Sequence, residues 1–367
     1  MKEVNIFADY VDEKTQEQFN LAMEQDYVVK GALMPDCHAG YTLPIGSVIA
    51  TNGVIVPSYV GYDIGCGMLA YKTNYHKVEI ENYLKNIFDE IYRTIPVGFN
   101  HNTVDVPWDN YNNIEKTSKT HEIFMKDGFK QHTTLGSGNH FQDLSYDEQG
   151  NVWVVIHSGS RGIGHSVASH YMRLASNSEK AIEGHFGLRT DSEIGKDYII
   201  DLNFCLEFAL ENRKGMLKRV LEAISKFVPN DIEIVEGDII NRNHNHAEYK
   251  NELWIHRKGA THADLGMRGV IPGNMRDGSF VVCGKGNEKS MCSSSHGAGR
   301  VMGRKEATRK LNIEDFEKSM EGIVARVNKD TLDESPMAYK NIFDVMEMQK
   351  DLVDVVCHLK PLINIKG

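Results

Sequence analysis

The chain has 367 residues, 25% of them charged, and a formal net charge of −10. This length can bury the core of one large domain or of two, and the acidic balance argues against binding nucleic acid over the whole surface. No apolar run approaches the ~20 residues that a bilayer-spanning helix needs. The N-terminus, MKEVNIFADYVDEK, also lacks the basic-then-apolar layout of a secretory signal, so we expect a soluble cytoplasmic protein with no membrane partner.

The first half of the chain shows one hairpin pattern, one helical pattern and one strong strand pattern. Residues 44–56 are expected to form a β-hairpin, because β-branched runs flank Asn52-Gly53, a pair typical of two-residue turns. Residues 79–92 place apolar side chains at helical spacing. The run VWVVI, residues 152–156, is expected to be a buried strand that leads directly into HSGSRG.

The second half is predicted to contain a long helix, then short strands and two further helices. Apolar residues recur at helical spacing over residues 201–228. The other predicted strands are 231–240, 252–257 and 279–283, and the other predicted helices are 313–327 and 340–358.

Strands and helices alternate irregularly along the chain, and glycine-rich loops interrupt the strands. This pattern favours an α+β fold over a regular doubly wound sheet. No repeat or long linker divides the sequence. We therefore expect a single large domain, residues 1–367, with mixed β-sheets surrounded by helices.

Six cysteines stand singly along the sequence, with no CxxC pair and no spacing that suggests a disulfide framework. We expect free thiols in a reducing compartment. Cys66 is unusual because it lies between two glycines in VGYDIGCGM, residues 60–68, where neighbouring side chains offer little cover. A role in chemistry therefore explains it better than a role in filling the core.

Several of the sixteen histidines lie in glycine- or serine-rich loops at the ends of predicted strands. A single histidine is more often a satisfied polar group than a ligand, but loops of this kind often carry function on a rigid frame. Five such loops together favour a shared site. The residues are His38, His140, His157, His244 and His296.

Asp63 and Cys66 add a carboxylate and a thiolate to three of these imidazoles. A thiolate sulfur has enough lone pairs to bridge two metal ions. The mixture of nitrogen and sulfur ligands favours zinc on chemistry alone and leaves iron, cobalt and manganese open. The plausible metal set is Asp63, Cys66, His140, His157 and His244.

Four glycine-lined segments are suited to holding an anion: HSGSRG, SSSHGAGR, GSGNHF and GKGNEKS. Small residues let backbone N–H groups approach phosphate oxygens, and Arg161 and Arg300 offer planar donor forks. None of the four matches the P-loop or the dinucleotide-binding fingerprint.

Taken together, these motifs resemble the RtcB RNA-splicing ligases. The resemblance rests on VGYDIGCGM, LGSGNHF, HSGSRGIG, RKGAT, GVIPGNM, GNEKSMCSSSHGAGRVMGR and the closing AYKNIFDVMEMQKDLVDVV with its terminal KG. It extends in the family's order from about Met34 to the C-terminus, without a counterpart for residues 95–130. It implies a single catalytic domain with the RtcB-like fold.

The resemblance implies a GTP-dependent RNA ligase that uses two manganese ions per site in tRNA splicing or RNA repair. Such enzymes join an RNA 3′-phosphate or 2′,3′-cyclic phosphate to an RNA 5′-hydroxyl. His296 would attack the α-phosphate of GTP and carry GMP. The guanylate would then pass to the RNA 3′-phosphate, and the 5′-hydroxyl would expel it. An accessory activating protein is a further partner to test for.

The resemblance assigns roles to individual residues of this chain. The resemblance makes Asp63, Cys66, His140, His157 and His244 metal ligands, His296 the nucleophile, Asp36 the residue that orients it, and Arg161 an RNA-phosphate contact. The guanylate-binding positions are Asn139, His140, Phe141, Gln142, Asp143, His244, Asn245, Pro272, Gly273, Asn274, Met275, Ser279, His296, Gly297, Ala298, Gly299 and Lys366.

The chain departs from the family pattern at three of these places. Asp143 stands where a glutamate usually pairs with the guanine edge, and it is one methylene shorter. His244 follows Asn243 where a histidine is often found, and Asn274 stands where serine is common. These departures indicate a divergent branch.

Two alternatives stay open at this stage. A metal-dependent phosphoesterase that opens cyclic phosphates would need the metal set but not His296. A non-catalytic RNA-binding paralogue would tolerate Asp143. The sequence does not identify the RNA substrate, which could be tRNA halves or cleaved ribosomal RNA.

Overall fold

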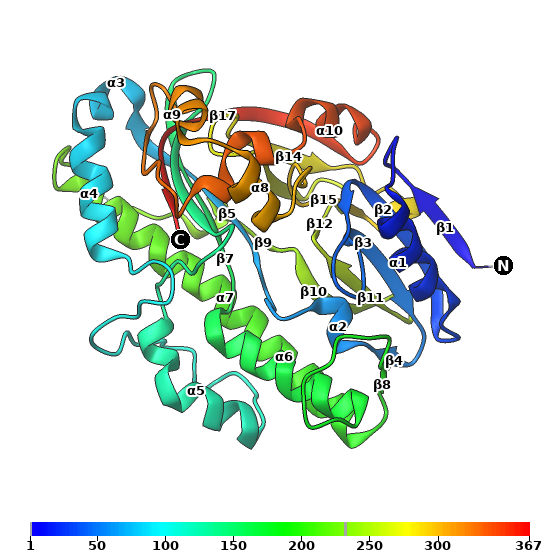
Figure 1. Ribbon diagram of the computed structural model, residues 1–367. Helices are drawn as coiled ribbons and strands as arrows, with labels where there is room; N and C mark the ends of the chain where they lie inside the picture. The colour runs from blue at the N-terminus through cyan, green and yellow to red at the C-terminus, as the bar shows by residue number, and fades with distance from the viewer. Residues whose placement is uncertain (1, 231–232) are drawn as a thin grey trace.

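The computed structural model describes residues 2–230 and 233–367, and mixed β-sheets surrounded by helices form its centre (Figure 1). The largest sheet among these residues is antiparallel except where β16 joins β17. In spatial order it contains β13 (Arg268–Pro272), β14 (Ser279–Gly284), β17 (Val353–Lys366), β6 (Phe141–Tyr146), β7 (Asn151–Ser158), β5 (Gly67–His76) and β9 (Ile240–Asn243), with β16 (Val324–Ala325) beside β17.

A second sheet is built from the N-terminal strands and from the hairpin that follows β9. Its order is β1 (Glu3–Ile6), β2 (Val28–His38), β3 (Ile45–Thr51), β11 (Leu253–Lys258) and β10 (Asn245–Lys250), and only β1 and β2 are parallel. Two small pairs complete the strands: β12 (Ala260–His262) with β15 (Ser293–Ser295), and β4 (Val54–Ile55) with β8 (Leu188–Arg189).

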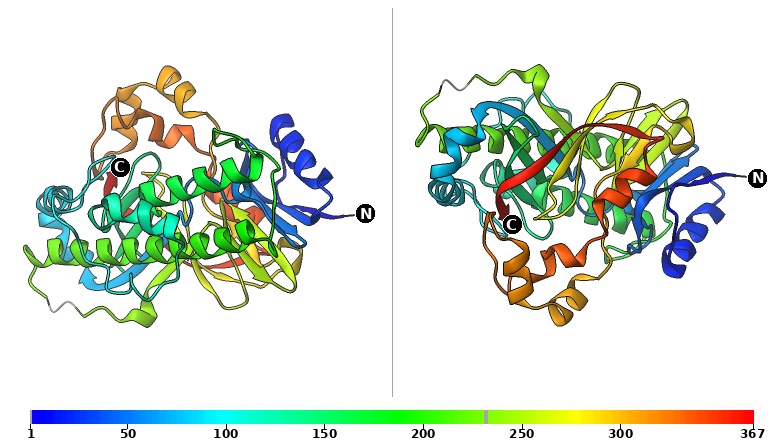
Figure 2. Two further views of the ribbon diagram at one scale, coloured as in Figure 1. Left: turned by 90° about the horizontal axis from the view of Figure 1, so that it is seen from below. Right: turned by 90° about the horizontal axis from the view of Figure 1, so that it is seen from above.

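The described helices lie around these sheets (Figure 2). The α-helices are α1 (Glu13–Glu24), α2 (Pro57–Val60), α3 (Lys77–Ile80), α4 (Leu84–Thr94), α5 (Ser118–Gln131), α6 (Arg161–Ser176), α7 (Glu193–Ser225), α8 (Arg304–Lys310), α9 (Ile313–Ser319) and α10 (Ile342–Met348). The short 3₁₀ turns are η1 (Glu81–Tyr83), η2 (Glu236–Asp238), η3 (Glu288–Ser290), η4 (Leu332–Glu334) and η5 (Pro336–Ala338). No described helix is both long enough and apolar enough to cross a membrane.

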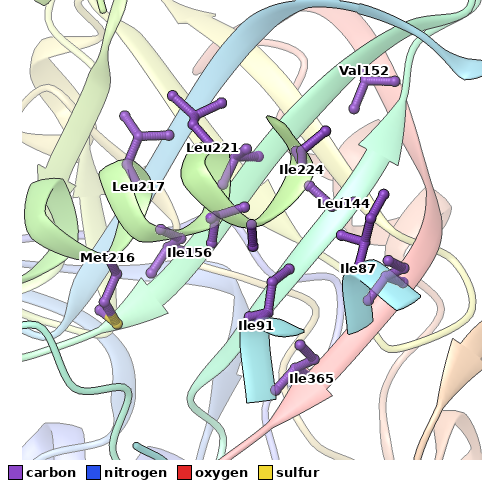
Figure 3. Packing of buried hydrophobic residues seen from close by; sticks show 14 of the residues in the cluster. Ile87, Ile91, Leu144, Val152, Ile156, Met216, Leu217, Leu221, Ile224 and Ile365 are labelled. Carbon is purple, nitrogen blue, oxygen red and sulfur yellow. The ribbon is translucent and has the colours of Figure 1, made fainter. Parts of the chain in front are cut away.

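One large apolar core lies between the larger sheet and the helices α4 and α7 (Figure 3). On α7, Leu217, Leu221 and Ile224 follow helical spacing and point at the sheet, where they meet Leu144 and Ile156. Burying one such side chain contributes roughly 1.5–3 kcal/mol. This packing fixes α7 against the strands whose ends carry the site.

A second, aromatic core holds α5 to α7. Trp108, from the segment before α5, packs 5.3 Å from Phe204 and 5.4 Å from Phe208 between ring centroids. Phe124 of α5 adds an edge-to-face contact with Phe204 at 5.5 Å. Residues 95–130 had no counterpart in the family resemblance. This aromatic packing anchors them to α7.

The predicted α+β class is confirmed, and several predicted elements are correct. The strand at 152–156 is β7, those at 252–257 and 279–283 are β11 and β14, and the helix at 201–228 is the C-terminal part of α7. The helix at 79–92 is split into α3, η1 and α4.

The predicted hairpin at 44–56 is wrong, although Gly53 has the turn conformation with φ +63°. β3 already has β2 on one edge and β11 on the other, so β4 has no free edge there and pairs with β8. The predicted helix at 313–327 ends at Ser319, before β16.

The predicted helix at 340–358 is wrong in its second half, where β17 begins at Val353. β-Branched residues in the run VDVV favour this strand. The strand predicted at 231–240 is wrong for its described part, which holds η2 and only the first residue of β9. Residues 231–232 lie outside the described residues.

Candidate metal centre and nucleotide cavity

The register of the larger sheet brings four of the predicted ligands to one edge. Gly67 is opposite both Ser158 and Asn243, and Phe141 is opposite His157. Cys66, His140 and His244 each adjoin one of these paired residues in the chain. Antiparallel pairing therefore places the starts of β5 and β6 beside the ends of β7 and β9, although the ligands are far apart in sequence.

The ligand atoms of all five predicted metal residues converge. Sγ of Cys66 lies 3.4 Å from Nε2 of His140 and 3.1 Å from Nε2 of His157. His140 Nε2 is 3.0 Å from an Asp63 carboxylate oxygen, and His157 Nε2 is 3.2 Å from His244 Nε2. Cys66 belongs to two overlapping groups, one with Asp63 and His140 and one with His157 and His244. Each group would offer three ligand atoms to a divalent cation, with Cys66 common to both groups.

Hydrogen bonds orient two of these imidazoles toward the centre. Nδ1 of His140 donates to the carbonyl of Leu135 at 3.1 Å, and Nδ1 of His157 donates to that of Asn139 at 3.0 Å. A ring with its single proton on Nδ1 would point the lone pair of Nε2 at the cluster. Lone pairs aimed at one another repel, so the donor set fits a divalent cation.

Burial shifts the pKa values of the buried metal-centre residues toward their uncharged forms. It lowers the pKa of His157 and of His244 well below the usual range, and neighbouring imidazoles lower both further. Burial also raises the pKa of the Cys66 thiol, with the Asp63 carboxylate adding to the effect. A bound cation favours the thiolate and would reverse this.

The glycines around Cys66 serve close packing. Cys66 is buried, contrary to the open setting that its neighbours suggested. A Cβ on Gly67 would lie 2.8 Å from Cα of Asn243, and one on Gly65 would lie 2.8 Å from Cβ of Ala209. Glycine lets the loop that carries Cys66 lie directly against β9 and α7.

Arg213, in the middle of α7, ties the loops of the metal centre together, and the sequence gave no signal for this role. It is fully buried and donates to the carbonyls of Gly65 and Ser158 at 2.9 and 2.7 Å. It also donates to the side-chain oxygens of Asn241 and Asn243, both at 2.6 Å. One guanidinium thus braces the chain beside Cys66, His157 and His244.

His296 lies beside the metal centre and is held by Asp36. Its ring centroid is 4.8 Å from that of His244. One carboxylate oxygen of Asp36 accepts from Nδ1 of His296 at 2.7 Å and from the backbone N–H groups of His296 and Gly297 at 3.2 and 3.3 Å. Because Nδ1 donates to Asp36, a neutral His296 ring would carry its lone pair on Nε2.

Asp36 is completely buried on β2. Burial alone would raise the pKa of its carboxyl, but the adjacent His296 outweighs burial and holds the pKa below its usual range. Asp36 is therefore an anion that faces the imidazole. Its neighbour His38 has a pKa lowered to about 4, mainly by burial.

A cavity of about 290 Å³ opens beside His296. Its volume suits a nucleotide base and part of its sugar. Predicted guanylate positions that line it are Asn139, Phe141, Asp143, Pro272, Gly273, Asn274, Met275, His296, Gly297, Ala298, Gly299 and Lys366. Most of the predicted nucleotide set is therefore gathered around one space.

Five predicted guanylate positions lie outside that lining. The side chain of Gln142 is on the opposite face of β6, buried with its amide unpaired among described residues. Asn245 accepts from the N–H of Gly259 at 2.8 Å and so joins two loops of the site. Ser279 is buried at the start of β14, and His140 and His244 are in the metal centre.

A buried ion cluster forms one wall of the cavity, and its centre, Glu334, was not predicted. The Glu334 carboxylate accepts from Lys366 at 2.7 Å, from Arg304 at 2.7 Å and from Arg300 at 3.0 Å. Tyr339 donates to the same carboxylate at 2.7 Å. Arg304 also pairs with Asp333 at 2.6 Å, so two carboxylates face three cations, and the cluster keeps one net positive charge beside the cavity.

A larger cavity of about 850 Å³ reaches the metal centre at Asp63 and His140, whereas the smaller cavity reaches it at His157. α5 and α6 form its walls and contribute Lys119, Lys126 and Arg173. Other residues that line it are Arg161, Tyr62, His165, His170 and Phe99.

Arg161 is the first residue of α6, and hydrogen bonds hold its side chain in place. Its Nε donates to Thr134 Oγ1 at 2.9 Å and its Nη2 donates to the carbonyl of Gly98 at 2.7 Å. Its backbone has φ +57°, an uncommon conformation for a residue with a side chain. The guanidinium is thus held in place on the wall of the larger cavity.

A third group of possible ligands, His246, Glu248 and His262, already has a cation. Nη1 of Arg257 lies 3.2 Å from His246 Nε2, 2.6 Å from Glu248 Oε1 and 3.1 Å from His262 Nε2. The guanidinium occupies the position that a metal would take. This group is therefore a structural network.

Comparison with known proteins gives one consistent family. The sequence model of the family described as tRNA-splicing ligase RtcB matches residues 18–367, beginning earlier than the resemblance in the motifs. The chain is 34% identical to the RNA-splicing ligase RtcB of Escherichia coli K12 over 92% of this chain and 90% of that protein. It is 30% identical to the tRNA-splicing ligase RtcB of Aeropyrum pernix, over 95% and 90% respectively, and 27% identical to that of Thermococcus kodakarensis, over 97% and 91%.

Proposed function

The chain belongs to the RtcB family of RNA-splicing ligases, and on this premise we propose that it joins RNA ends in the cytoplasm, in tRNA splicing or RNA repair. The ends are a 3′-phosphate or 2′,3′-cyclic phosphate and a 5′-hydroxyl. The reaction uses GTP and Mn²⁺ and passes through GMP bound to His296. The observation that carries the proposal is the buried Asp36–His296 pair, whose nucleophilic nitrogen adjoins a donor set for divalent cations.

Asp63, Cys66, His140, His157 and His244 would hold the cations. When bound, these neutralise phosphate oxygens and keep the reacting groups in line. The protein supplies the rest: hydrogen bonds that aim the imidazoles, Arg213 that braces their loops, and a cavity for the nucleotide.

The nucleophile is prepared by Asp36. In the first step Nε2 of His296 forms a bond to the α-phosphorus of GTP, and the bond to pyrophosphate breaks. The imidazole becomes cationic as this bond forms, and Asp36, which accepts from Nδ1, stabilises that charge. A 3′-phosphate oxygen of the RNA then takes the guanylate and frees His296.

The last step needs a second RNA end on the side away from the nucleotide. The 5′-hydroxyl forms a bond to the 3′-phosphate, loses its proton, and expels GMP. In-line displacement places the entering oxygen opposite the leaving one. The path that we propose for this second RNA end is the larger cavity, which reaches the metal centre at Asp63 and His140 rather than at His157.

The lining of the larger cavity suits a single RNA strand. Lys119, Lys126 and Arg173 bring positive charge to this lining, which Glu122 offsets in part by pairing with Lys119 at 2.8 Å. Tyr62 stacks on His165 with centroids 4.8 Å apart and planes 19° apart, and Phe99 is 92% exposed. Aromatic faces of this kind stack with unpaired bases.

The test is RNA joining by the purified chain. One strand carries a labelled 3′-phosphate, or a 2′,3′-cyclic phosphate in a parallel reaction, and the other has a 5′-hydroxyl. With GTP and Mn²⁺ we expect a joined product from the wild type and none from His296→Ala. His76→Ala is the matched control, because His76 ends β5 at the end opposite Cys66 and should leave joining unchanged.

Two outcomes would contradict the proposal. Opening of the cyclic phosphate by both wild type and His296→Ala, with no joining by either, would make the protein a metal-dependent phosphoesterase. Binding of RNA without any reaction would make it a non-catalytic member of the family.

A further inference from the structure

The base end of the nucleotide cavity contains a buried pair of polar side chains, Asp143 and Asn364. Asp143 on β6 is directly opposite Asn364 on β17. Their side chains are 3% and 2% exposed, and both line the cavity. Because side chains alternate along a strand, Phe141 and Lys366 share this face, while Ile363 and Ile365 point into the core behind the sheet.

The two side chains are bonded in a way that leaves two acceptors unused. Nδ2 of Asn364 donates to one carboxylate oxygen of Asp143 at 2.5 Å. No described residue donates to Oδ1 of Asn364, which is fully buried, and none donates to the second carboxylate oxygen of Asp143. A buried acceptor without a donor costs about 1–3 kcal/mol, so a ligand that brings donors is favoured.

We propose that Asn364 is a second base-reading residue, which works with Asp143 to select guanine through two adjacent donors. In its ionised form Asp143 accepts from N1–H, and Oδ1 of Asn364 accepts from the 2-amino group. Asn364 is not among the residues that the family resemblance assigns to the nucleotide. The inference rests on the proposed function, because it takes the cavity to be the guanylate site.

Asp143 is shorter than the usual glutamate, and Asn364 supplies the acceptor that the shorter side chain cannot. A glutamate at this position could span both donors of guanine, whereas aspartate reaches one methylene less far. Asn364 holds Asp143 in place with its amide N–H and extends the acceptor surface with its carbonyl oxygen. Adenine offers an acceptor at N1 and no 2-amino group, and hypoxanthine lacks the 2-amino group alone.

The pair IMP and GMP isolates this contact, because the two differ only by the 2-amino group. Calorimetric titration of the full chain with Mn²⁺, at a pH above 8 so that Asp143 is ionised, should show that the wild type binds GMP about 10- to 100-fold more tightly than IMP. In Asn364→Ala this preference should fall to about 3-fold or less. Asn364→Ser, which keeps a hydroxyl near Asp143 but does not reach the base, should give the same result if the alanine variant fails to fold.

Lys360→Ala is the matched control, since Lys360 is exposed on the same strand. It should keep the wild-type preference. An equal GMP-to-IMP ratio in wild type and Asn364→Ala would overturn the inference, as would a wild type that does not distinguish the two.

Covalent labelling separates this failure from failure of the proposed function. Asn364→Ala should still acquire label from α-labelled GTP at saturating concentration, because His296 and Asp36 are untouched. A wild type that binds GMP selectively but never becomes labelled would contradict the ligase proposal and leave the role of Asn364 standing.

Discussion

Replacing Asp36 with asparagine tests how the nucleophile is prepared. The change keeps the shape of the side chain and removes its charge. In the native protein one oxygen of Asp36 accepts from Nδ1 of His296 and from two backbone N–H groups. The backbone bonds set the position of the carboxylate, and the Nδ1 bond faces the charge that develops on the ring during attack.

The magnitude follows from that single bond. A hydrogen bond to a charged group contributes about 1.5–3 kcal/mol, and a neutral one contributes about 0.5–1.5 kcal/mol. The difference grows as the ring becomes cationic, so we take about 2–3 kcal/mol in the transition state. At about 1.4 kcal/mol for each factor of ten, Asp36→Asn should slow guanylylation about 30- to 150-fold.

The assay is the single-turnover rate of covalent labelling by α-labelled GTP at fixed Mn²⁺. Affinity for GMP should change little, because Asp36 does not line the nucleotide cavity. Asp26→Asn, at an exposed carboxylate, is the matched control and should label at the wild-type rate. Labelling of Asp36→Asn at the wild-type rate would refute the role given to Asp36.

Three further predictions concern Arg213, the larger cavity and the protonation of Asp143. Arg213→Met should weaken Mn²⁺ binding about 10- to 100-fold in equilibrium dialysis, because the loops of three ligands lose their shared donor; unchanged affinity would contradict the bracing role. Lys119→Glu with Lys126→Glu should reduce RNA affinity and flatten its salt dependence, measured by fluorescence anisotropy from 50 to 200 mM salt as a test of counterion release, whereas GTP labelling should persist; an unchanged salt slope would exclude the cavity as the RNA path. Burial raises the pKa of Asp143 to about 8, and Lys366 only partly opposes this. Asp143 therefore stays protonated below about pH 8, and guanosine affinity should fall as pH drops from 9 to 7, by up to about tenfold per pH unit; a pH dependence that persists in Asp143→Asn would refute this.

The chemistry of the metal centre could be predicted from the sequence because it depends on residue types. A carboxylate, a thiol and several histidines in glycine-rich loops have few other common uses. All five predicted ligands converge in the structure. Their convergence itself was not visible in the sequence, because it follows from the order β6-β7-β5-β9 and the register that sets Gly67 opposite both Ser158 and Asn243.

The supporting residues escaped prediction for a different reason. Arg213 lies in a long helical pattern where an arginine is typical of a solvated face, and only the packing of α7 against the sheet buries it. Glu334 and Asn364 lie in segments without a motif, and their roles depend on partners about 30 and more than 200 residues away. The spacing of residues within a short segment does not reveal contacts between distant parts of the chain.

The fold errors have a similar origin. Residues 340–358 contain apolar residues that fit helical spacing and β-branched residues that fit a strand. From Val353 onward the chain forms a strand rather than a helix, because β17 pairs with both β14 and β6. In the hairpin at 44–56 the turn residues were identified correctly, but the neighbours of β3 were not.

The most direct test of the central claim is to incubate the chain with α-labelled GTP and Mn²⁺ and to map any covalent label by mass spectrometry. A phosphoramidate on histidine is labile to acid and stable to base, which distinguishes it from a phosphoester. The account predicts close to one GMP per chain, attached at His296, that disappears when Mn²⁺ is omitted or when Cys66 is changed to alanine. A wild-type protein that stays unlabelled with every divalent metal tried, or that carries the label on another residue, would contradict it.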